Sequence, residues 1–138
     1  MSLAGGTVVD SNVLIDVMAG NATWAPWSAA RLAEAFDRGE VVLNPIVYAE
    51  LAVGFGRIED LNAALPERLA REDLPWEASF VAGRAFREHL ARGGTRRSPL
   101  PDFYIAAHAA VTGRSLLTRD AARHLRAVPS LSVISPDE

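Results

Sequence analysis

Short apolar runs that alternate with longer helical segments restrict the fold of this chain more than any other feature. Thr7-Val8-Val9, Val41-Val42-Leu43 and Leu116-Leu117 are typical of strands buried within a sheet. Between them, apolar residues recur at helical spacing. A helix between two strands carries the chain back across the sheet, so such strands pair in parallel. The pattern predicts an α/β fold with a central, mainly parallel β-sheet flanked by helices.

Proline, serine and glycine mark where the helices between these strands begin and end. The expected helices are Ser11–Met18, Pro26–Arg38, Pro45–Val53, Ile58–Leu69 with a break at Pro66, Trp76–Ala91, Pro101–Gly113 and Ala121–Arg126. A minor strand is expected around Leu74 and a last strand at Leu131–Ile134. The 138 residues show no repeat or linker, so we expect one domain over residues 1–138.

Composition limits the chemistry available to the chain. It has no cysteine and only three scattered histidines, which argues against thiolate and zinc sites. A metal would be held mainly by oxygen, which favours Mg²⁺ or Mn²⁺. No long uncharged run could span a bilayer, and the N-terminus has neither a basic region nor an apolar signal core, so we expect a cytoplasmic protein without membrane contact.

Two acidic residues follow expected strands. Asp10 comes directly after Val9, and Asp120 follows Leu117 by three residues. Sites in parallel α/β sheets gather at the carboxyl ends of the strands. Taken alone, each residue is better explained as a helix N-cap than as a ligand.

Two further acids lie on the apolar faces of expected helices. Glu50 follows Ile46 by one turn, and Asp102 is in line with Ile105 and Ala106. A capping role or a salt bridge to a buried arginine would explain either one. Together with the two acids at strand ends, however, they are better explained by a converging acidic pocket. Crowded carboxylates repel each other unless a cation binds, and bound Mg²⁺ would suit the pocket to phosphodiester hydrolysis.

Four segments that contain these acids resemble, in order and spacing, the motifs of PIN-domain nucleases, especially the VapC toxins of toxin–antitoxin systems. They are Val8–Asp16, Asn44–Leu51, Leu100–Ala109 and Leu116–Asp120. The resemblance implies a PIN-like fold and a metal-dependent endoribonuclease that leaves a 5′-phosphate and a 3′-hydroxyl.

By the same resemblance, Asp10, Glu50, Asp102 and Asp120 would be catalytic and bind the metal. Asn12 and Thr118 would orient a carboxylate or a metal-bound water. Many relatives carry another acid two residues after the fourth-motif aspartate, where this chain has Ala122, so the number of metal ions stays open. Asp16 is interpreted as a solvated helix acid.

The net charge of −3 argues weakly against nucleic-acid binding, but all 14 basic residues are arginine, which suits phosphate contact. Arg96 and Arg97 flank a Gly-Gly loop and are weak candidates for contacts to RNA phosphates; a solvated loop explains them equally well. His89, His108 and His124 are interpreted as structural.

Partners follow from the family resemblance. It implies RNA as the substrate, with transfer RNA and ribosomal RNA both reasonable, a cognate antitoxin protein, and a homodimer. The alternatives are a catalytically silent PIN-like module that binds RNA or protein and, third, an aspartate-nucleophile phosphatase of the haloacid dehalogenase kind. The phosphatase is disfavoured because position 12 is Asn and the chain has no lysine.

Overall fold

The computed structural model describes residues 5–95 and 100–136. One sheet runs through them in the order β3-β2-β1-β4-β5, and each neighbouring pair is parallel. Its strands are β1 (Thr7–Val9), β2 (Val41–Leu43), β3 (Ala70–Arg71), β4 (Ser115–Leu117) and β5 (Val133–Ile134). The predicted α/β fold is confirmed, and the sheet is parallel throughout.

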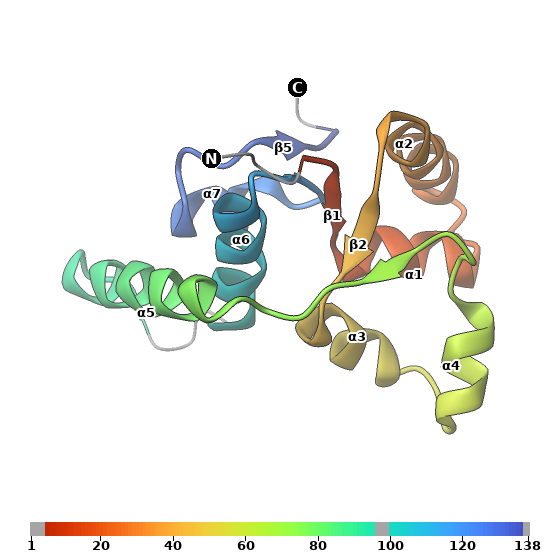
Figure 1. The fold of residues 1–138 in the computed structure, drawn as a ribbon, viewed down its shortest axis with the longest axis horizontal. Coiled ribbons are helices and arrows are strands. Elements are labelled where there is room, and N and C mark those ends of the chain that lie inside the picture. The colour runs from red at the N-terminus through yellow and green to blue at the C-terminus, as the bar shows by residue number, and fades with distance from the viewer. Residues whose placement is uncertain (1–4, 96–99, 137–138) are drawn as a thin grey trace.

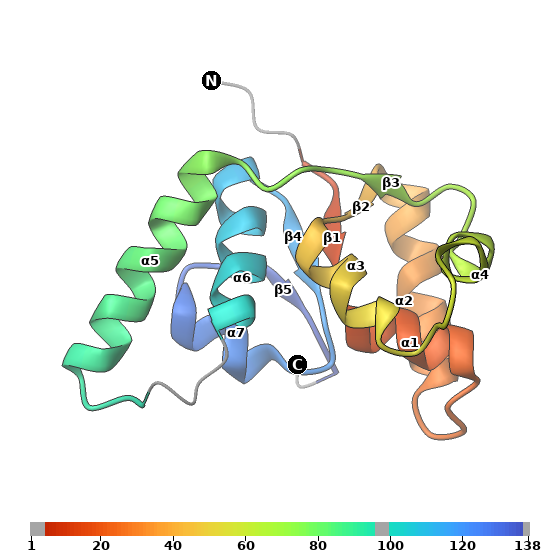
Figure 2. The same ribbon diagram turned by 90° about the horizontal axis from the view of Figure 1, so that it is seen from below.

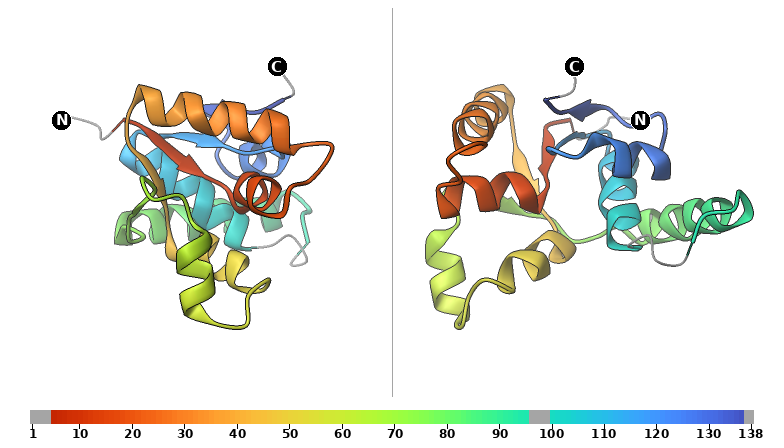
Figure 3. Two further views of the ribbon diagram at one scale, coloured as in Figure 1. Left: turned by 90° about the vertical axis from the view of Figure 1, so that its right-hand side faces the viewer. Right: turned by 180° about the vertical axis from the view of Figure 1, so that it is seen from behind.

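Helices cover both faces of this sheet. They are α1 (Ser11–Ala19), α2 (Ala25–Arg38), α3 (Pro45–Ala52), α4 (Ile58–Ala64), α5 (Trp76–Ala91), α6 (Leu100–Thr112) and α7 (Ala121–Ala127). The pair α1 and α2 lies on one face, and α6 lies on the other with α5 packed against it (Figures 1 and 3). In Figure 2, α5 and α4 stand at opposite sides of the molecule. None of the helices in the described ranges could cross a membrane.

Polar residues at the strand ends start two of the helices. The carboxylate of Asp10 accepts a hydrogen bond from the backbone N–H of Ser11 and caps α1. Asn44 Oδ1 accepts from the N–H of Val47 at 2.9 Å and caps α3, where Pro45 occupies the first turn. Both caps satisfy backbone groups that a helix start leaves free.

The segment after α4 differs from the sequence prediction. We expected a helix over Ile58–Leu69 and a strand near Leu74, but α4 ends at Ala64 and β3 forms earlier, at Ala70–Arg71. Leu65 is extended, with φ −72° and ψ 144°, as the residue before a proline prefers. The chain therefore leaves the helix early enough for Ala70 to pair with Val42.

The strand register decides which polar residues meet at the carboxyl edge of the sheet. Val9 pairs with Leu117 in the neighbouring strand. Because the strands run in the same direction, the residues that follow them, Asp10 and Thr118, come next to each other. The side chains of both are buried there.

Candidate functional site

Asp10, Glu50, Asp102 and Asp120, which we call the acidic cluster, come from four separate elements. Asp10 follows β1, Glu50 lies on α3, Asp102 lies in the first turn of α6, and Asp120 precedes α7. Shared contacts join them: Ser11 hydrogen-bonds to both Asp10 and Glu50, and Arg123 forms ion pairs with both Asp102 and Asp120. His124 contacts Asp10 and the backbone oxygen of Asp102. The residues singled out from sequence are thus neighbours in space.

Asp10 is the most fully hydrogen-bonded member of the cluster. Its Oδ1 accepts from the Ser11 N–H at 2.7 Å, and its Oδ2 accepts from Thr118 Oγ1 at 2.8 Å and lies 2.9 Å from His124 Nε2. Burial acts to raise the pKa of Asp10, but the hydrogen bond and charge of His124, with Thr118 and Ser11, outweigh it. The net pKa is lowered, so this carboxylate stays charged.

Asp102 is held differently. The residue is 5% exposed, yet its Oδ2 has no hydrogen-bond partner. Burial raises its pKa above the usual value, and the negative charges of Asp10 and Asp120 add to the rise, while Arg123 and His124 oppose it. A buried carboxylate oxygen without a partner is unfavourable in a folded protein and calls for a ligand.

Glu50 lies at the half-buried side of the cluster. Its Oε1 accepts a hydrogen bond from Ser11 Oγ at 2.8 Å, which ties α3 to the start of α1. Burial raises its pKa, and the charges of Asp10 and Asp102 add to the effect. The apolar stripe on which the sequence placed this residue correctly indicated that it turns inward.

Asp120 is far more exposed than Asp10 and Asp102: 45% of its side chain is accessible, against 4% and 8%. Arg123, one turn later on α7, places Nε 2.7 Å from Asp120 Oδ2 and Nη1 3.5 Å from Asp102 Oδ2. Neither contact has hydrogen-bond geometry, since Arg123 Nε and Asp102 Oδ2 both lack a hydrogen-bond partner. They are ion pairs held by charge.

The two expected polar neighbours connect the strand ends. Asn12 Nδ2 donates to Thr118 Oγ1 at 3.2 Å, and Asn12 Oδ1 accepts from the Arg119 N–H at 3.2 Å. Thr118 Oγ1 in turn donates to Asp10 and accepts from the Asp120 N–H at 3.0 Å. These bonds restrict the position of Asp10 relative to Asp120, as residues that orient a ligand would.

The donor chemistry of the cluster fits a divalent cation such as Mg²⁺, because its side chains offer carboxylate oxygens and one of them, Asp102 Oδ2, is buried without a partner. No group of three or more acids and histidines within residues 5–95 and 100–136 is arranged to hold a metal ion as it stands. Asp10 is engaged by His124, and Asp120 by Arg123.

His124 is the contact that sequence reasoning missed, since we interpreted it only as a structural histidine. It is fully buried, with Nε2 on Asp10 and Nδ1 3.3 Å from the backbone oxygen of Asp102. Burial acts to lower its pKa, but Asp10 and Asp102 outweigh this and the net pKa is raised. Its spacing from the buried Ala121 and Ala127, three residues on either side, indicates burial but not the partner.

Asp16 corrects another interpretation from sequence. It is 1% exposed instead of solvated. Arg119 binds both of its oxygens, from Nε at 2.6 Å and Nη2 at 3.0 Å, and Ser28 Oγ donates to it at 2.7 Å. The same guanidinium lies 5.0 Å from the ring of Trp24, so Arg119 supports the packing of α1 on α2 beside the cluster. The two arginines assigned to RNA contact, Arg96 and Arg97, lie outside the described residues.

A second set of polar residues, which we call the buried network, consists of the buried Asn44, His108 and Arg114 and the partly exposed Glu72. Arg114 donates to Glu72 from Nε at 3.0 Å and from Nη2 at 2.7 Å. His108 lies between Glu72 Oε1, at 2.7 Å, and Asn44 Nδ2, at 2.9 Å. The predicted structural role of His108 is confirmed, since both ring nitrogens have partners.

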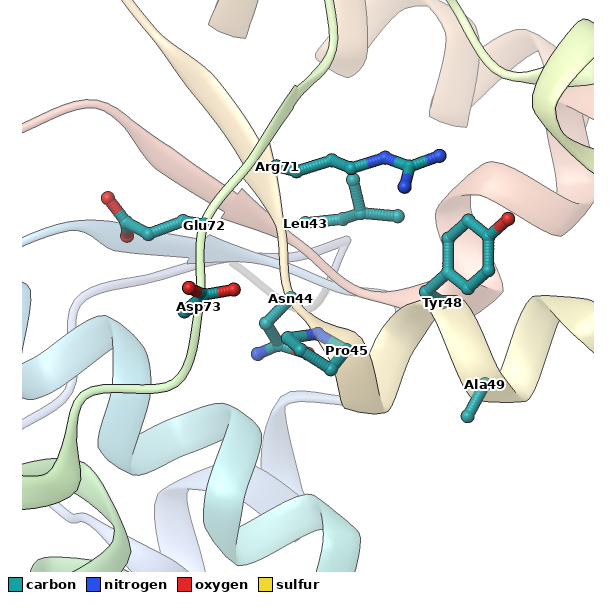
Figure 4. A pocket seen from close by; sticks show the side chains of 8 residues that line it. All are labelled: Leu43, Asn44, Pro45, Tyr48, Ala49, Arg71, Glu72 and Asp73. Carbon is teal, nitrogen blue, oxygen red and sulfur yellow. The ribbon is translucent and has the colours of Figure 1, made fainter.

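A cavity of about 240 Å³ adjoins this network and not the acidic cluster. Figure 4 shows Asn44 and Glu72 at its wall, with Tyr48 and Arg71 on the side of α3. A larger groove of about 430 Å³ lies between α1 and α3, and its lining includes the apolar Ile15, Met18 and Phe55 together with Glu50. An apolar surface therefore meets the cluster from one side.

The chain is similar in sequence to one protein family and in fold to several solved structures. The family model described as PIN domain matches residues 7–129, and no curated protein matches the sequence. Among solved structures, a chain of VapBC2 from Rickettsia felis, bound to a DNA fragment from their promoter, has a TM-score of 0.74 at 20% identity over 94% of this chain and 97% of that one. A chain of VapBC-1 from nontypeable Haemophilus influenzae has a TM-score of 0.73 at 22% identity, over 94% of this chain and 96% of that one. A chain of a toxin–antitoxin complex from Klebsiella pneumoniae has a TM-score of 0.61 at 20% identity, over 96% of this chain and 99% of that one.

Proposed function

Because this chain belongs to the PIN domain family, we propose that it is a Mg²⁺-dependent endoribonuclease, in which Mn²⁺ can replace Mg²⁺, and the toxin of a toxin–antitoxin pair. One observation carries the proposal. Asp102 buries a carboxylate oxygen without a hydrogen-bond partner, among acids whose charges raise its pKa. Such an arrangement is unfavourable for stability and is what a cation-binding site requires.

The residues that would hold the ion are Asp10, Glu50, Asp102 and Asp120. When bound, a divalent ion lowers the pKa of water, polarises a phosphate and stabilises the leaving oxygen. The protein keeps its ligands in place beforehand. Ser11 fixes Asp10 through its N–H and Glu50 through its hydroxyl, at 2.7 and 2.8 Å.

Hydrogen bonds to Thr118 and His124 keep Asp10 ionised, because they favour its charged form. His124 is fully buried and also lies against the Asp102 backbone, so it positions both acids. We assign it a positioning role because its fully buried side chain cannot contact substrate. RNA would approach from the more exposed side, where Asp120 lies.

We propose that a cognate antitoxin covers the groove between α1 and α3. The groove is mainly apolar, with Ile15 45% and Val53 88% exposed, and Glu50 of the acidic cluster is one of its lining residues. A segment with an apolar face seated there would reach the acidic cluster with its next residues. Structural relatives of this chain include chains of toxin–antitoxin complexes. A homodimer is proposed from the family resemblance, and size exclusion with light scattering tests it.

The test is cleavage of labelled structured RNAs by the purified protein, comparing Mg²⁺ with EDTA. Wild type should cleave only with metal, and Asp102→Asn should lose at least about 100-fold in rate, as when a charge-stabilising group is removed from a site. Asp37→Asn, an exposed acid on α2, is the matched control and should cleave as wild type does. Cleavage that survives EDTA or the Asp102 substitution would refute the proposal.

The second candidate is a silent PIN-like binding module. It is favoured by the pairing of Asp120 with Arg123, which leaves that acid engaged without metal. A silent module should bind no Mn²⁺ and cleave no RNA, although it remains folded. Mn²⁺ binding that Asp102→Asn removes would exclude it.

A further inference from the structure

Arg123 is the charged residue of the site that neither the motifs nor the proposed function uses. It lies on α7, three residues after Asp120, with its guanidinium 2.7 Å from Asp120 and 3.5 Å from Asp102. In the described part of the chain, no other arginine forms an ion pair with the acidic cluster. The guanidinium therefore occupies the space between two of the four acids.

A nearby arginine shows how loosely Arg123 is held. Arg119 binds Asp16 through two hydrogen bonds, at 2.6 and 3.0 Å, and Asp16 is almost fully buried. Arg123 has no hydrogen bond through Nε, and 40% of its side chain is exposed. An arginine that is held by ion pairs and is partly exposed can leave when a stronger cation arrives.

The oxygen that faces Arg123 is also the one that a metal would need. Asp102 Oδ2 is buried, has no hydrogen-bond partner and lies nearest to Nη1 of Arg123. A divalent ion bound to that oxygen and to Asp120 would meet the guanidinium charge at close range. Like charges a few ångströms apart repel, and near a protein surface this repulsion is strong enough to lower the affinity for the ion.

We propose that Arg123 is a resident counter-ion of the acidic cluster that competes with a divalent cation for Asp102 and Asp120. The inference rests on the proposed metal-dependent function and adds a control on it. Arg123 stabilises the metal-free acids and weakens metal binding, so the protein takes up the ion only where the ion is abundant enough to displace the arginine.

A merely structural role for Arg123 makes a different prediction. Spacing of three residues on a helix is enough to explain its pairing with Asp120 as ordinary support for α7. In that case, replacing Arg123 would change stability slightly and leave metal affinity unaltered. The affinity for a metal ion separates the two roles, whereas stability does not.

The experiment is a calorimetric titration of the metal-free protein with Mn²⁺ alone, at pH 8. Arg123→Ala should bind Mn²⁺ about tenfold more tightly than wild type, because a repelling charge has been removed. Arg123→Lys, which keeps the charge, should stay near wild type. Arg126→Ala removes an exposed arginine from the same helix and should change the affinity by less than about twofold, since a solvated charge is screened.

A double variant tests whether Arg123 acts on metal affinity through Asp102. In the Asp102→Asn background, Arg123→Ala should lose most of its effect on Mn²⁺ affinity, because the contested oxygen is gone. Arg123→Gln serves as a second substitution if the alanine variant does not fold, as judged by circular dichroism.

The outcomes distinguish this inference from the function on which it rests. If wild type binds Mn²⁺ and Arg123→Ala binds it equally or more weakly, Arg123 does not compete and only this inference is overturned. If neither protein binds Mn²⁺ at millimolar concentration, the range of weak protein sites for divalent ions, both the inference and the proposed metal dependence fail.

Discussion

The acidic cluster and the buried network use the same three kinds of side chain with opposite results. In each region, carboxylates pair with a buried histidine and with an arginine: with His124 and Arg123 at the cluster, and with His108 and Arg114 in the network. The helix α6 contributes to both, with Asp102 in its first turn and His108 further along. In the network, Glu72 receives hydrogen bonds from Arg114 and His108, and its pKa is lowered by Arg114 first of all. In the cluster, the pKa values of Glu50 and Asp102 are raised.

The difference lies in how completely the charges are paired. Arg114 is 4% exposed and donates to Glu72, to Glu40 and to the backbone oxygen of Gly5, so each charge in the network has partners. Asp102 has an oxygen with none. A protein that folds on its own gains nothing from such an imbalance, and it is characteristic of sites kept for a ligand.

Breaking the network should have the largest effect on stability. Arg114→Met leaves Glu72 partly buried without its main partner and should lower the free energy of unfolding by about 3–5 kcal/mol. Arg57→Met removes an ion pair with Glu59 that is about 70% exposed on both sides, and should change it by less than about 1 kcal/mol. Urea denaturation of both variants measures this. Similar losses of unfolding free energy in the two variants would show that the network stabilises the fold no more than an exposed ion pair does.

Neutralising one acid in each region should change stability in opposite directions. In EDTA, Asp102→Asn should raise the free energy of unfolding by about 1–2 kcal/mol, because it removes a buried charge that its neighbours repel. Glu72→Gln should lower it by about 1–3 kcal/mol, because it weakens charged hydrogen bonds. Denaturation curves of the two variants and of wild type measure both changes. A loss of stability in Asp102→Asn would contradict the prediction that the two substitutions act in opposite directions.

The pH dependence of these two effects should separate the regions further. Glu72 has a folded-state pKa below its usual 4.5, so its stabilisation is present above that pH and is lost as the pH falls through the lower value. Asp102 has a folded-state pKa above its usual 3.8, so its destabilisation is absent below that pH and grows as the pH rises through the higher value. Unfolding in EDTA from pH 3 to 7 should therefore show the benefit of Asp102→Asn appearing, and the loss in Glu72→Gln deepening, as the pH rises.

The smallest effect is expected at Glu50, which is half-buried and therefore better screened by solvent than Asp102. Glu50→Gln should stabilise the metal-free protein by a few tenths of a kcal/mol, as surface charge changes do. Ser11→Ala, which removes the hydroxyl that holds Glu50, serves as the matched control and should be slightly destabilising. If Glu50→Gln stabilised the protein more than Asp102→Asn, burial would not be the main reason that the negative charges of the cluster are unfavourable.

Much of the fold and of the candidate site could be predicted because the signals are local. Buried runs such as Val41–Leu43 form strands at the expected positions, and Asp10 caps the helix that follows it, as its position after a strand indicates. The apolar stripe around Asp102 indicated an inward acid, which the structure confirms at 5% exposure. The strand after α4 was placed too late, because sheet pairing and not propensity decides where so short a strand forms.

The partners of the polar residues could not be predicted, because they are brought together from distant parts of the chain. Asp16 was expected in solvent, but Arg119, 103 residues away in sequence, binds it. His124 lies 114 residues from Asp10. The pairing of Arg123 with Asp120 follows from helical spacing, whereas its approach to Asp102 depends on how α7 packs on α6.

The sequence by itself determined the parallel α/β class, the residues that end its strands and the four acids that turn toward one another, because periodicity and strand ends are properties of short segments. Only the tertiary structure decided which of those acids are neutralised. Hydrogen bonds and ion pairs depend on distances of a few ångströms between elements far apart in the chain, and such distances are set by packing. Packing pairs Asp10 with His124 and Asp120 with Arg123, and it leaves Oδ2 of Asp102 without a hydrogen-bond partner.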